Sequence, residues 1–258
     1  MLEPGQCLKL VQSQAVALRD SGVVLPGRVF RSLVPGQRPG IVVAPGGQTR
    51  GSIEATQWLS VRLAAAGYTA LSMTWRTSRP LDDPRDIGLA LDWLAQDSGV
   101  DARRLALAGH SRGAMSALRA AAGEARVRAV VAMGTPWDLA YNVRSFAMYA
   151  PQREAMLAEW LGGRPDDVPE VYATVSAVTY ADRIHQPVLL IHGTADMTPP
   201  VHQVAWIERT LREAGNAHVQ VELIPGMGHQ FELGVHGYQF DRVARVVTAW
   251  LAGVLSPA

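Results

Sequence analysis

Gly109-His110-Ser111-Arg112-Gly113 joins an apolar run, residues 104–108, to a segment with helical spacing, residues 112–122. A serine flanked by glycines at a strand–turn–helix junction is typical of a nucleophile held on a sharp turn. The turn lifts the hydroxyl above the sheet, and the start of the helix places backbone N–H groups beside it. We therefore predict that Ser111 is a catalytic nucleophile.

A serine hydroxyl needs a base to accept its proton. The chain has seven histidines, and His229 is the favoured base. It ends the turn Pro225-Gly226-Met227-Gly228-His229, directly after a predicted strand at residues 219–224. That position places it at the carboxyl edge of a parallel sheet, where sites in open α/β folds form. His236 is the second candidate.

The third group should be a carboxylate that orients the imidazole. Asp196 follows another predicted strand, at residues 187–192, and gives the chain order Ser111, Asp196, His229. This order is the one found in α/β hydrolases with a serine nucleophile. Asp138, after the predicted strand at residues 127–133, is the competing acid.

An oxyanion formed at Ser111 would need two N–H donors. One is expected from Arg112, the residue after the nucleophile, and the other from the turn Pro45-Gly46-Gly47-Gln48 after an earlier strand. Gly47 is the first choice within that turn, and Gln48 is the alternative.

Short apolar runs bounded by glycine or proline alternate with longer segments of helical spacing. This alternation predicts an α/β fold with a mainly parallel sheet, whereas the first forty residues predict an antiparallel start. We expect strands at residues 8–11, 15–18, 28–33, 41–44, 68–75, 104–108, 127–133, 187–192 and 219–224, and helices at 52–66, 84–95, 112–122, 200–214 and 240–254.

Residues 137–184 interrupt the alternation, and a structureless loop of that length would be unusual. We predict a small helical insertion that covers a pocket within a single domain spanning residues 1–258. Its aromatic residues are expected to bind substrate, together with Trp75 at the end of an earlier strand: Trp137, Tyr141, Phe146 and Trp160. The alternative is that each of them only packs in the core of the insertion.

Composition excludes several classes of protein. The formal net charge is +1, so no basic excess indicates a nucleic-acid partner. No run approaches 18 apolar residues and no signal peptide is visible, so we expect a cytoplasmic protein without a membrane partner. Cys7 is the single cysteine, which rules out an intrachain disulfide.

The sequence resembles the α/β-hydrolase superfamily, and more narrowly the catalytic domain of prolyl-oligopeptidase-type peptidases and their small esterase relatives. The resemblance rests on the motif at Ser111, on residues 181–196 and on residues 226–231, and it covers about residues 40–251. It implies an eight-stranded, mostly parallel sheet with helices on both faces, an acyl-enzyme mechanism and neither a cofactor nor a metal.

Two departures from this family are visible. The chain has no room for the large propeller domain that such peptidases carry, and Pro45 stands where the family commonly has histidine. The sequence also resembles dienelactone-hydrolase-like proteins, whose usual nucleophile is cysteine, whereas Ser111 stands at that place here.

These features predict a carboxylesterase acting on small or medium acyl esters. Two alternatives stay open: a small serine peptidase or amidase that acts on a short peptide with the same three residues, and a non-enzymatic hydrolase-like binding protein. A homodimer is an assembly that the sequence permits.

Overall fold

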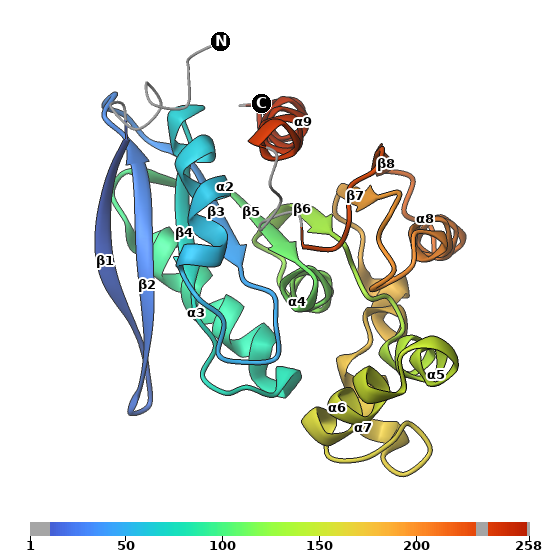
Figure 1. Ribbon diagram of the computed structural model, residues 1–258. Helices are drawn as coiled ribbons and strands as arrows, with labels where there is room; N and C mark the ends of the chain where they lie inside the picture. Colours follow the sequence, from blue (N-terminus) through green and yellow to red (C-terminus); the bar gives the residue numbers. More distant parts are fainter. Residues whose placement is uncertain (1–10, 231–236, 257–258) are drawn as a thin grey trace.

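An eight-stranded sheet forms the centre of the computed structural model, which describes residues 11–230 and 237–256 (Figure 1). The strand order is β1-β2-β4-β3-β5-β6-β7-β8, and every neighbouring pair from β4 to β8 is parallel. The strands are β1 (Val11–Asp20), β2 (Val23–Ser32), β3 (Arg38–Ala44), β4 (Thr69–Met73), β5 (Val100–His110), β6 (Val127–Met133), β7 (Val188–Gly193) and β8 (Val219–Ile224). The predicted eight-stranded, mostly parallel sheet is therefore confirmed.

The antiparallel start predicted for the sheet is also confirmed, but its strands differ from the prediction. Two ten-residue strands, β1 and β2, replace the short strands expected at residues 15–18 and 28–33, and they turn at Ser21 and Gly22, which have positive φ. Most side chains of β1 are exposed. An apolar run therefore identifies only part of this edge strand, and the predicted strand was too short. Residues 8–10 and Cys7 lie outside the described residues.

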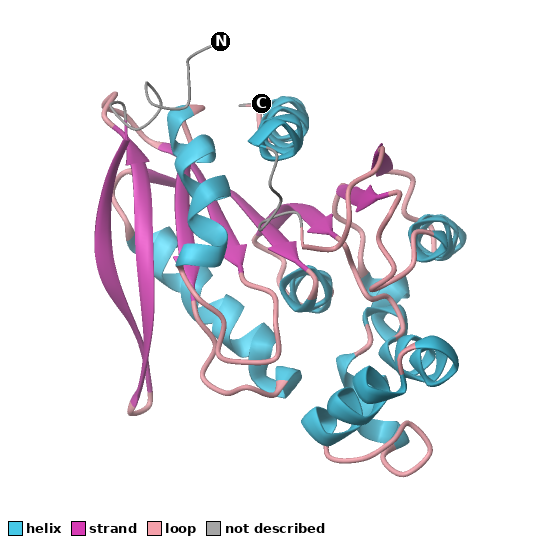
Figure 2. Ribbon diagram, in the orientation of Figure 1, coloured by secondary structure: helices cyan, strands magenta, loops and turns pink. Residues whose placement is uncertain are grey.

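Helices cover both faces of the sheet, as Figure 2 shows. On one face, α2 (Glu54–Ala65) and α9 (Gly237–Val254) pack over side chains such as Ile41 and Val131. On the other face, α3 (Asp83–Gln96), α4 (Arg112–Ala121) and α8 (His202–Glu213) pack over side chains such as Val42 and Val130. The central strands are largely apolar, as expected for strands with both faces buried.

The segment between β6 and β7 is mostly helical. It contains α5 (Leu139–Tyr149), α6 (Pro151–Leu161), α7 (Pro169–Val175) and the 3₁₀ helix η3 (Ala177–Arg183), and the helices α5–α7 project beyond the sheet (Figure 1). We refer to residues 137–184 as the cap segment. Within the described ranges, no helix is both long enough and apolar enough to cross a membrane.

The loops after β7 and β8 are held against each other. The Ala195 N–H donates to the Met227 carbonyl oxygen at 3.0 Å, and the Gly226 N–H donates to the Thr194 hydroxyl at 2.9 Å. A Cβ atom added to Gly193 would lie 2.0 Å from the same Met227 oxygen. The close approach of these two loops therefore requires glycine at the end of β7.

We predict that Gly193→Ala lowers the free energy of unfolding by about 2 kcal/mol or more, because the new methyl group meets a backbone oxygen that cannot move aside cheaply. Urea unfolding followed by circular dichroism measures this change. Gly88→Ala is the control, since nothing lies within 4 Å of its added Cβ inside α3. It should raise stability by about 0.5–1 kcal/mol. Equal losses in the two variants would contradict the packing argument.

Candidate active site

Ser111 lies on a strained turn between β5 and α4. Its backbone has φ 55° and ψ −118°, and its N–H donates to the Met133 carbonyl oxygen at 2.9 Å. A non-glycine residue in this conformation costs about 1–3 kcal/mol and needs a surrounding structure that holds it. The flanking glycines make the turn possible, since a Cβ on Gly109 would lie 2.3 Å from Gly113 and one on Gly113 would lie 2.2 Å from the Ala44 oxygen.

The three residues proposed as a triad form one hydrogen-bonded line. The Ser111 Oγ lies 3.0 Å from His229 Nε2, and His229 Nδ1 lies 2.8 Å from Asp196 Oδ2. With the proton of the neutral imidazole on Nδ1, Nε2 is the acceptor that faces the serine hydroxyl. The side chain of Asp196 is fully buried, so its interaction with the imidazole is little screened by water.

Two further groups hold the Asp196 carboxylate. The Thr198 N–H donates to Oδ1 at 2.6 Å, and His192 Nε2 lies 3.4 Å from Oδ2 while it contacts the Pro199 carbonyl oxygen at 3.0 Å. The competing acid, Asp138, instead caps α5 by accepting from the Tyr141 N–H at 3.0 Å. Asp138 therefore stabilises the start of α5, and Asp196 is the carboxylate that contacts His229.

The second candidate base, His236, lies outside the described residues. His110, beside the nucleophile, helps to position His229. Its Nε2 donates to the His229 carbonyl oxygen at 2.9 Å, and the centres of the two rings are 4.8 Å apart. Burial and the nearby His229 lower the pKa of His110 well below its usual value. His110 is therefore neutral at neutral pH.

The predicted oxyanion donors converge on the same cavity as Ser111. Arg112 is the first residue of α4, so its N–H has no acceptor within the helix. Gly47, with φ 91°, and Gln48 line the cavity in the loop after β3. Gly46 lets this loop approach the turn, because a Cβ there would lie 3.0 Å from the His110 oxygen and 3.3 Å from the Ser111 Cβ.

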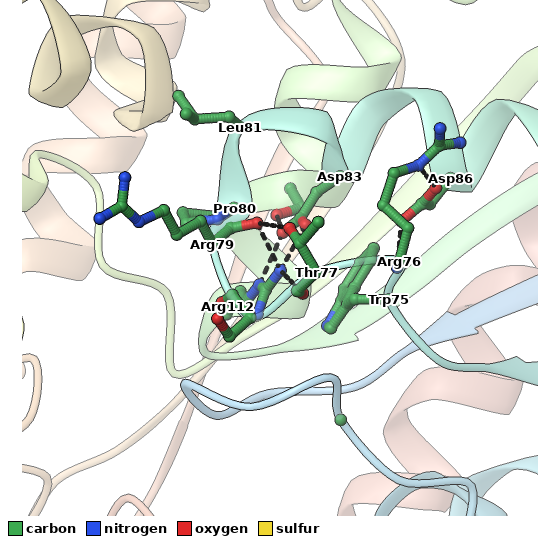
Figure 3. A network of polar contacts seen from close by, with 12 residues as sticks. Trp75, Arg76, Thr77, Arg79, Pro80, Leu81, Asp83, Asp86 and Arg112 are labelled. Carbon is green, nitrogen blue, oxygen red and sulfur yellow. Dashed lines mark hydrogen bonds and ion pairs between the residues drawn. The ribbon is translucent and has the colours of Figure 1, made fainter. Parts of the chain in front are cut away.

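The side chain of Arg112 makes contacts that the sequence motif does not specify (Figure 3). Its Nε and Nη2 donate to the two carboxylate oxygens of Asp83 at 2.8 and 2.6 Å, and both side chains are almost fully buried. The Ser116 hydroxyl donates to the same carboxylate at 2.6 Å. The remaining guanidinium N–H groups donate to backbone oxygens of two loops, those of Thr49, Thr77, Ser78 and Arg79.

Arg112 also lies between two tryptophans. The centre of its guanidinium is 5.0 Å from the Trp75 ring and 5.6 Å from the Trp160 ring, and Trp160 donates from Nε1 to the Ser78 carbonyl oxygen at 2.6 Å. Arg112, the residue after the nucleophile, therefore connects α4, the loop after β4 and the cap segment.

A cavity of about 270 Å³ opens beside Ser111 between the sheet edge and the cap segment. Apolar side chains form much of its wall, including Trp58, Met115, Leu139, Phe146, Leu157 and Trp160. No cluster of three or more possible metal ligands occurs among the residues that the structure describes.

Three of the five aromatic residues predicted to bind substrate do not line this cavity. Trp75 is buried under Arg112 and donates to the Pro45 carbonyl oxygen at 3.2 Å, and Trp137 is buried in the core. Tyr141 is exposed and contacts His202 and Trp206 of α8. The prediction was wrong for these residues. For Trp75 and Trp137 the reason is that apolar surface is buried equally well by the core as by a pocket, and for Tyr141 it is that the side chain packs on α8 at the surface.

Phe146 and Trp160 do line the cavity. Arg153 of the cap segment lines it as well, although it was not predicted from sequence. Arg153, Leu157 and Trp160 follow i, i+4, i+7 spacing along α6 and therefore share one face. That spacing was visible in the sequence, but not which face would meet the cavity. Trp58, which packs on Phe240 of α9, was also missed.

We predict that Arg112→Met lowers the free energy of unfolding by about 3–5 kcal/mol, because it leaves the Asp83 carboxylate buried without its cation. Chemical denaturation measures the loss. Arg126→Met is the matched control, since Arg126 pairs with Asp92 and Glu124 at a partly exposed position and should cost about 1 kcal/mol or less. Similar losses in both variants would show that the Arg112 pair adds nothing beyond a surface ion pair.

A second prediction concerns pH. Burial lowers the pKa of both His110 and His192 in the folded protein, so the unfolded chain takes up protons first as pH falls through about 6.5. The stability from these neutral histidines is complete above that pH and declines below it. His192→Gln should therefore show a shallower loss of stability between pH 7.5 and 5 in urea titrations. Exposed His185→Gln is the control, and identical slopes for wild type and His192→Gln would contradict the prediction.

Known proteins share both the sequence pattern and the fold. Esterase LipC of Mycobacterium tuberculosis is 29% identical over 216 residues, which cover 76% of this chain and 53% of LipC, so the chain spans about half the length of that relative. The acylaminoacyl peptidase of Pyrococcus horikoshii superposes with a TM-score of 0.81 at 15% identity, over 100% of this chain and 44% of that one. An esterase of Pyrobaculum calidifontis superposes with a TM-score of 0.75 at 19% identity, over 94% of this chain and 85% of that one.

These superpositions establish the α/β-hydrolase fold. The family model described as "Prolyl oligopeptidase family" matches residues 71–257, which include Ser111, Asp196 and His229 and amount to well over half of the chain. The chain therefore belongs to the prolyl oligopeptidase family.

Proposed function

We propose that the protein is a serine hydrolase that cleaves carboxylic esters of small or medium acyl groups through an acyl-enzyme. The observation that carries this proposal is the hydrogen-bonded line from Ser111 through His229 to Asp196 beside a largely apolar cavity. A cavity of about 270 Å³ is near the lower end of the range for small-molecule sites, which supports short acyl groups.

In the acylation step, Ser111 Oγ attacks the ester carbonyl carbon while His229 Nε2 takes the hydroxyl proton. Asp196 holds the imidazole by its Nδ1–H and stabilises the imidazolium that forms. The developing oxyanion would accept from the N–H groups of Arg112 and Gly47, with Gln48 as the alternative to Gly47. The tetrahedral intermediate then collapses, and the proton passes from His229 to the departing alcohol oxygen.

In the deacylation step, a water molecule takes the place of the alcohol. His229 removes one of its protons as the water oxygen attacks the acyl carbon, and the same donors hold the second oxyanion. The Ser111 ester bond breaks, the proton returns to Ser111 Oγ and the carboxylic acid leaves. Neutral His110 and His192 do not compete for this proton, because burial lowers the pKa of each.

A peptidase or amidase is the second candidate function, favoured by the likeness to the acylaminoacyl peptidase fold. The same three residues would act, with an amine as the leaving group. A panel of 4-nitrophenyl esters and aminoacyl 4-nitroanilides separates the two functions. We expect the esters to give the higher kcat/KM after correction for leaving-group reactivity, and the reverse order would favour the peptidase.

Ser111→Ala should lower kcat for 4-nitrophenyl butyrate roughly 10⁴- to 10⁶-fold and abolish labelling by a fluorophosphonate probe, because the nucleophile is lost. The variant should stay folded, since removing one hydroxyl leaves the core intact. Exposed Ser98→Ala is the matched control and should keep both readouts. Undiminished hydrolysis by Ser111→Ala would exclude Ser111 as the nucleophile, and an unlabelled wild type would favour the non-enzymatic binding protein.

A further inference from the structure

In the part of the chain that the structure describes, cationic side chains line the cavity beside Ser111 and acidic ones do not. Among the described residues of its wall, Arg112 and Arg153 are the permanently charged groups, and neither aspartate nor glutamate occurs there. The charge of Arg112 is compensated below the cavity by the bidentate contact with Asp83. Arg153 has no such compensation in the part of the chain that the structure describes.

Arg153 comes from the first turn of α6, in the cap segment. Its Nε is buried and has no hydrogen-bond partner among the described residues, and no carboxylate in the same ranges lies within ion-pair distance of its guanidinium. Its guanidinium lies over the Phe146 ring, with 5.0 Å between the guanidinium carbon and the ring centre. A buried guanidinium N–H without an acceptor is costly, so this position favours an anionic partner.

The other arginines of the cap segment do not share this situation. Arg144 pairs with Asp166 at 2.6 Å, and Arg164 lies 3.6 Å from Glu154. Asp166 and Glu154 are therefore paired with these two arginines, whereas Arg153 lines the cavity. Burial lowers the pKa of Arg153, but Tyr149 and Asp196 raise it, and a guanidinium so placed keeps its proton at neutral pH.

We propose that Arg153 binds a carboxylate of the substrate, so that the preferred substrates are esters carrying one carboxylate several atoms from the scissile carbonyl, such as the monoesters of dicarboxylic acids. This inference rests on the proposed function. Ser111 lies at the carboxyl end of β5 and Arg153 lies in the cap segment. A substrate that spans the cavity therefore presents its ester to Ser111 and its anionic group to Arg153.

Two features favour a carboxylate over a phosphate. The planar guanidinium matches the two oxygens of a carboxylate with two parallel N–H bonds. One uncompensated arginine balances one negative charge, whereas a phosphate monoester carries about two at neutral pH. Among the described wall residues the other arginine is Arg112, whose charge Asp83 already balances, and the neighbours Phe146 and Leu157 are apolar. Water is largely displaced from such a wall, which strengthens the attraction between the two charges.

The test compares esters that differ in one charged group. The first pair is 4-nitrophenyl hexanoate and the 4-nitrophenyl monoester of adipic acid, which carries the carboxylate on the acyl chain. The second pair is phenyl hexanoate and 4-(hexanoyloxy)benzoate, which carries it on the leaving group. In one of the pairs, Arg153→Met should lower the anionic-to-neutral ratio of kcat/KM by about 10- to 100-fold, the effect expected for a charge-assisted hydrogen bond.

The ratio cancels any general loss of activity in the variant. Arg153→Lys, which keeps the charge but loses the fork, should give an intermediate ratio. Arg144→Met is the matched control, because it removes a cap arginine that pairs with Asp166 away from the cavity wall. It should leave the ratio as in the wild type. A ratio within two-fold of the wild type for Arg153→Met in both pairs would overturn the proposal.

A binding experiment separates this inference from the proposed function. The Ser111→Ala protein is titrated by calorimetry with two anionic amides, N-phenyladipamate and 4-(hexanoylamino)benzoate, each compared with N-phenylhexanamide, and none of them needs turnover. Tighter binding of one anionic compound, lost in the Ser111→Ala, Arg153→Met protein, would support the carboxylate site even if no ester were hydrolysed. If Ser111→Ala bound neither anionic compound more tightly than N-phenylhexanamide, the proposal would be overturned, even if Ser111 is the nucleophile and Arg153→Met does not fold.

Discussion

The contact between the turn at Ser111 and the end of β3 is the constraint on which the site depends. A Cβ at Gly113 would lie 2.2 Å from the Ala44 oxygen, and one at Gly109 would lie 2.3 Å from Gly113, so β5, α4 and β3 meet at van der Waals distance. This packing holds the backbone of Ser111 at a positive φ, which residues other than glycine rarely adopt. The hydroxyl consequently faces the cavity and His229 instead of the core.

The residue after the nucleophile connects that turn to the rest of the molecule. Its backbone N–H begins α4, while its side chain runs to Asp83 and to the loop after β4. Those loop residues offer backbone oxygens as acceptors, and Trp160 of the cap segment donates to the oxygen of Ser78. One arginine therefore relates the position of the nucleophile to the wall of the cavity, through hydrogen bonds that are buried at Asp83 and partly buried at the loop.

Burial acts differently on the charged groups around this cavity. It lowers the pKa of His110 and His192 and keeps them neutral, whereas Asp196 keeps two N–H contacts, one from Thr198 and one from His229. Arg112 forms an ion pair with Asp83, whereas the guanidinium of Arg153 lies over the Phe146 ring. A partly buried guanidinium without an ion-pair partner would favour an anion at Arg153, because opposite charges attract more strongly where water screens them less.

The order of strands and helices and the three residues that meet at Ser111 could be predicted from sequence, because each signal is local. Ser111, Asp196 and His229 each follow an apolar strand, and a parallel sheet brings the carboxyl ends of its strands to one edge. The long antiparallel strands at the start could not be delimited, since most side chains of β1 are exposed and its apolar pattern is weak.

Tertiary packing alone decided which side chains form the wall of the cavity. Trp75 and Trp137 are as apolar as Phe146 and Trp160, yet the first two are in the core and the others face the cavity. The reason is that burial of apolar area is non-directional and does not distinguish a core from a pocket. Whether an arginine is paired likewise depends on which carboxylates the fold brings near it, so the contrast between Arg112 and Arg153 exists only in the folded chain.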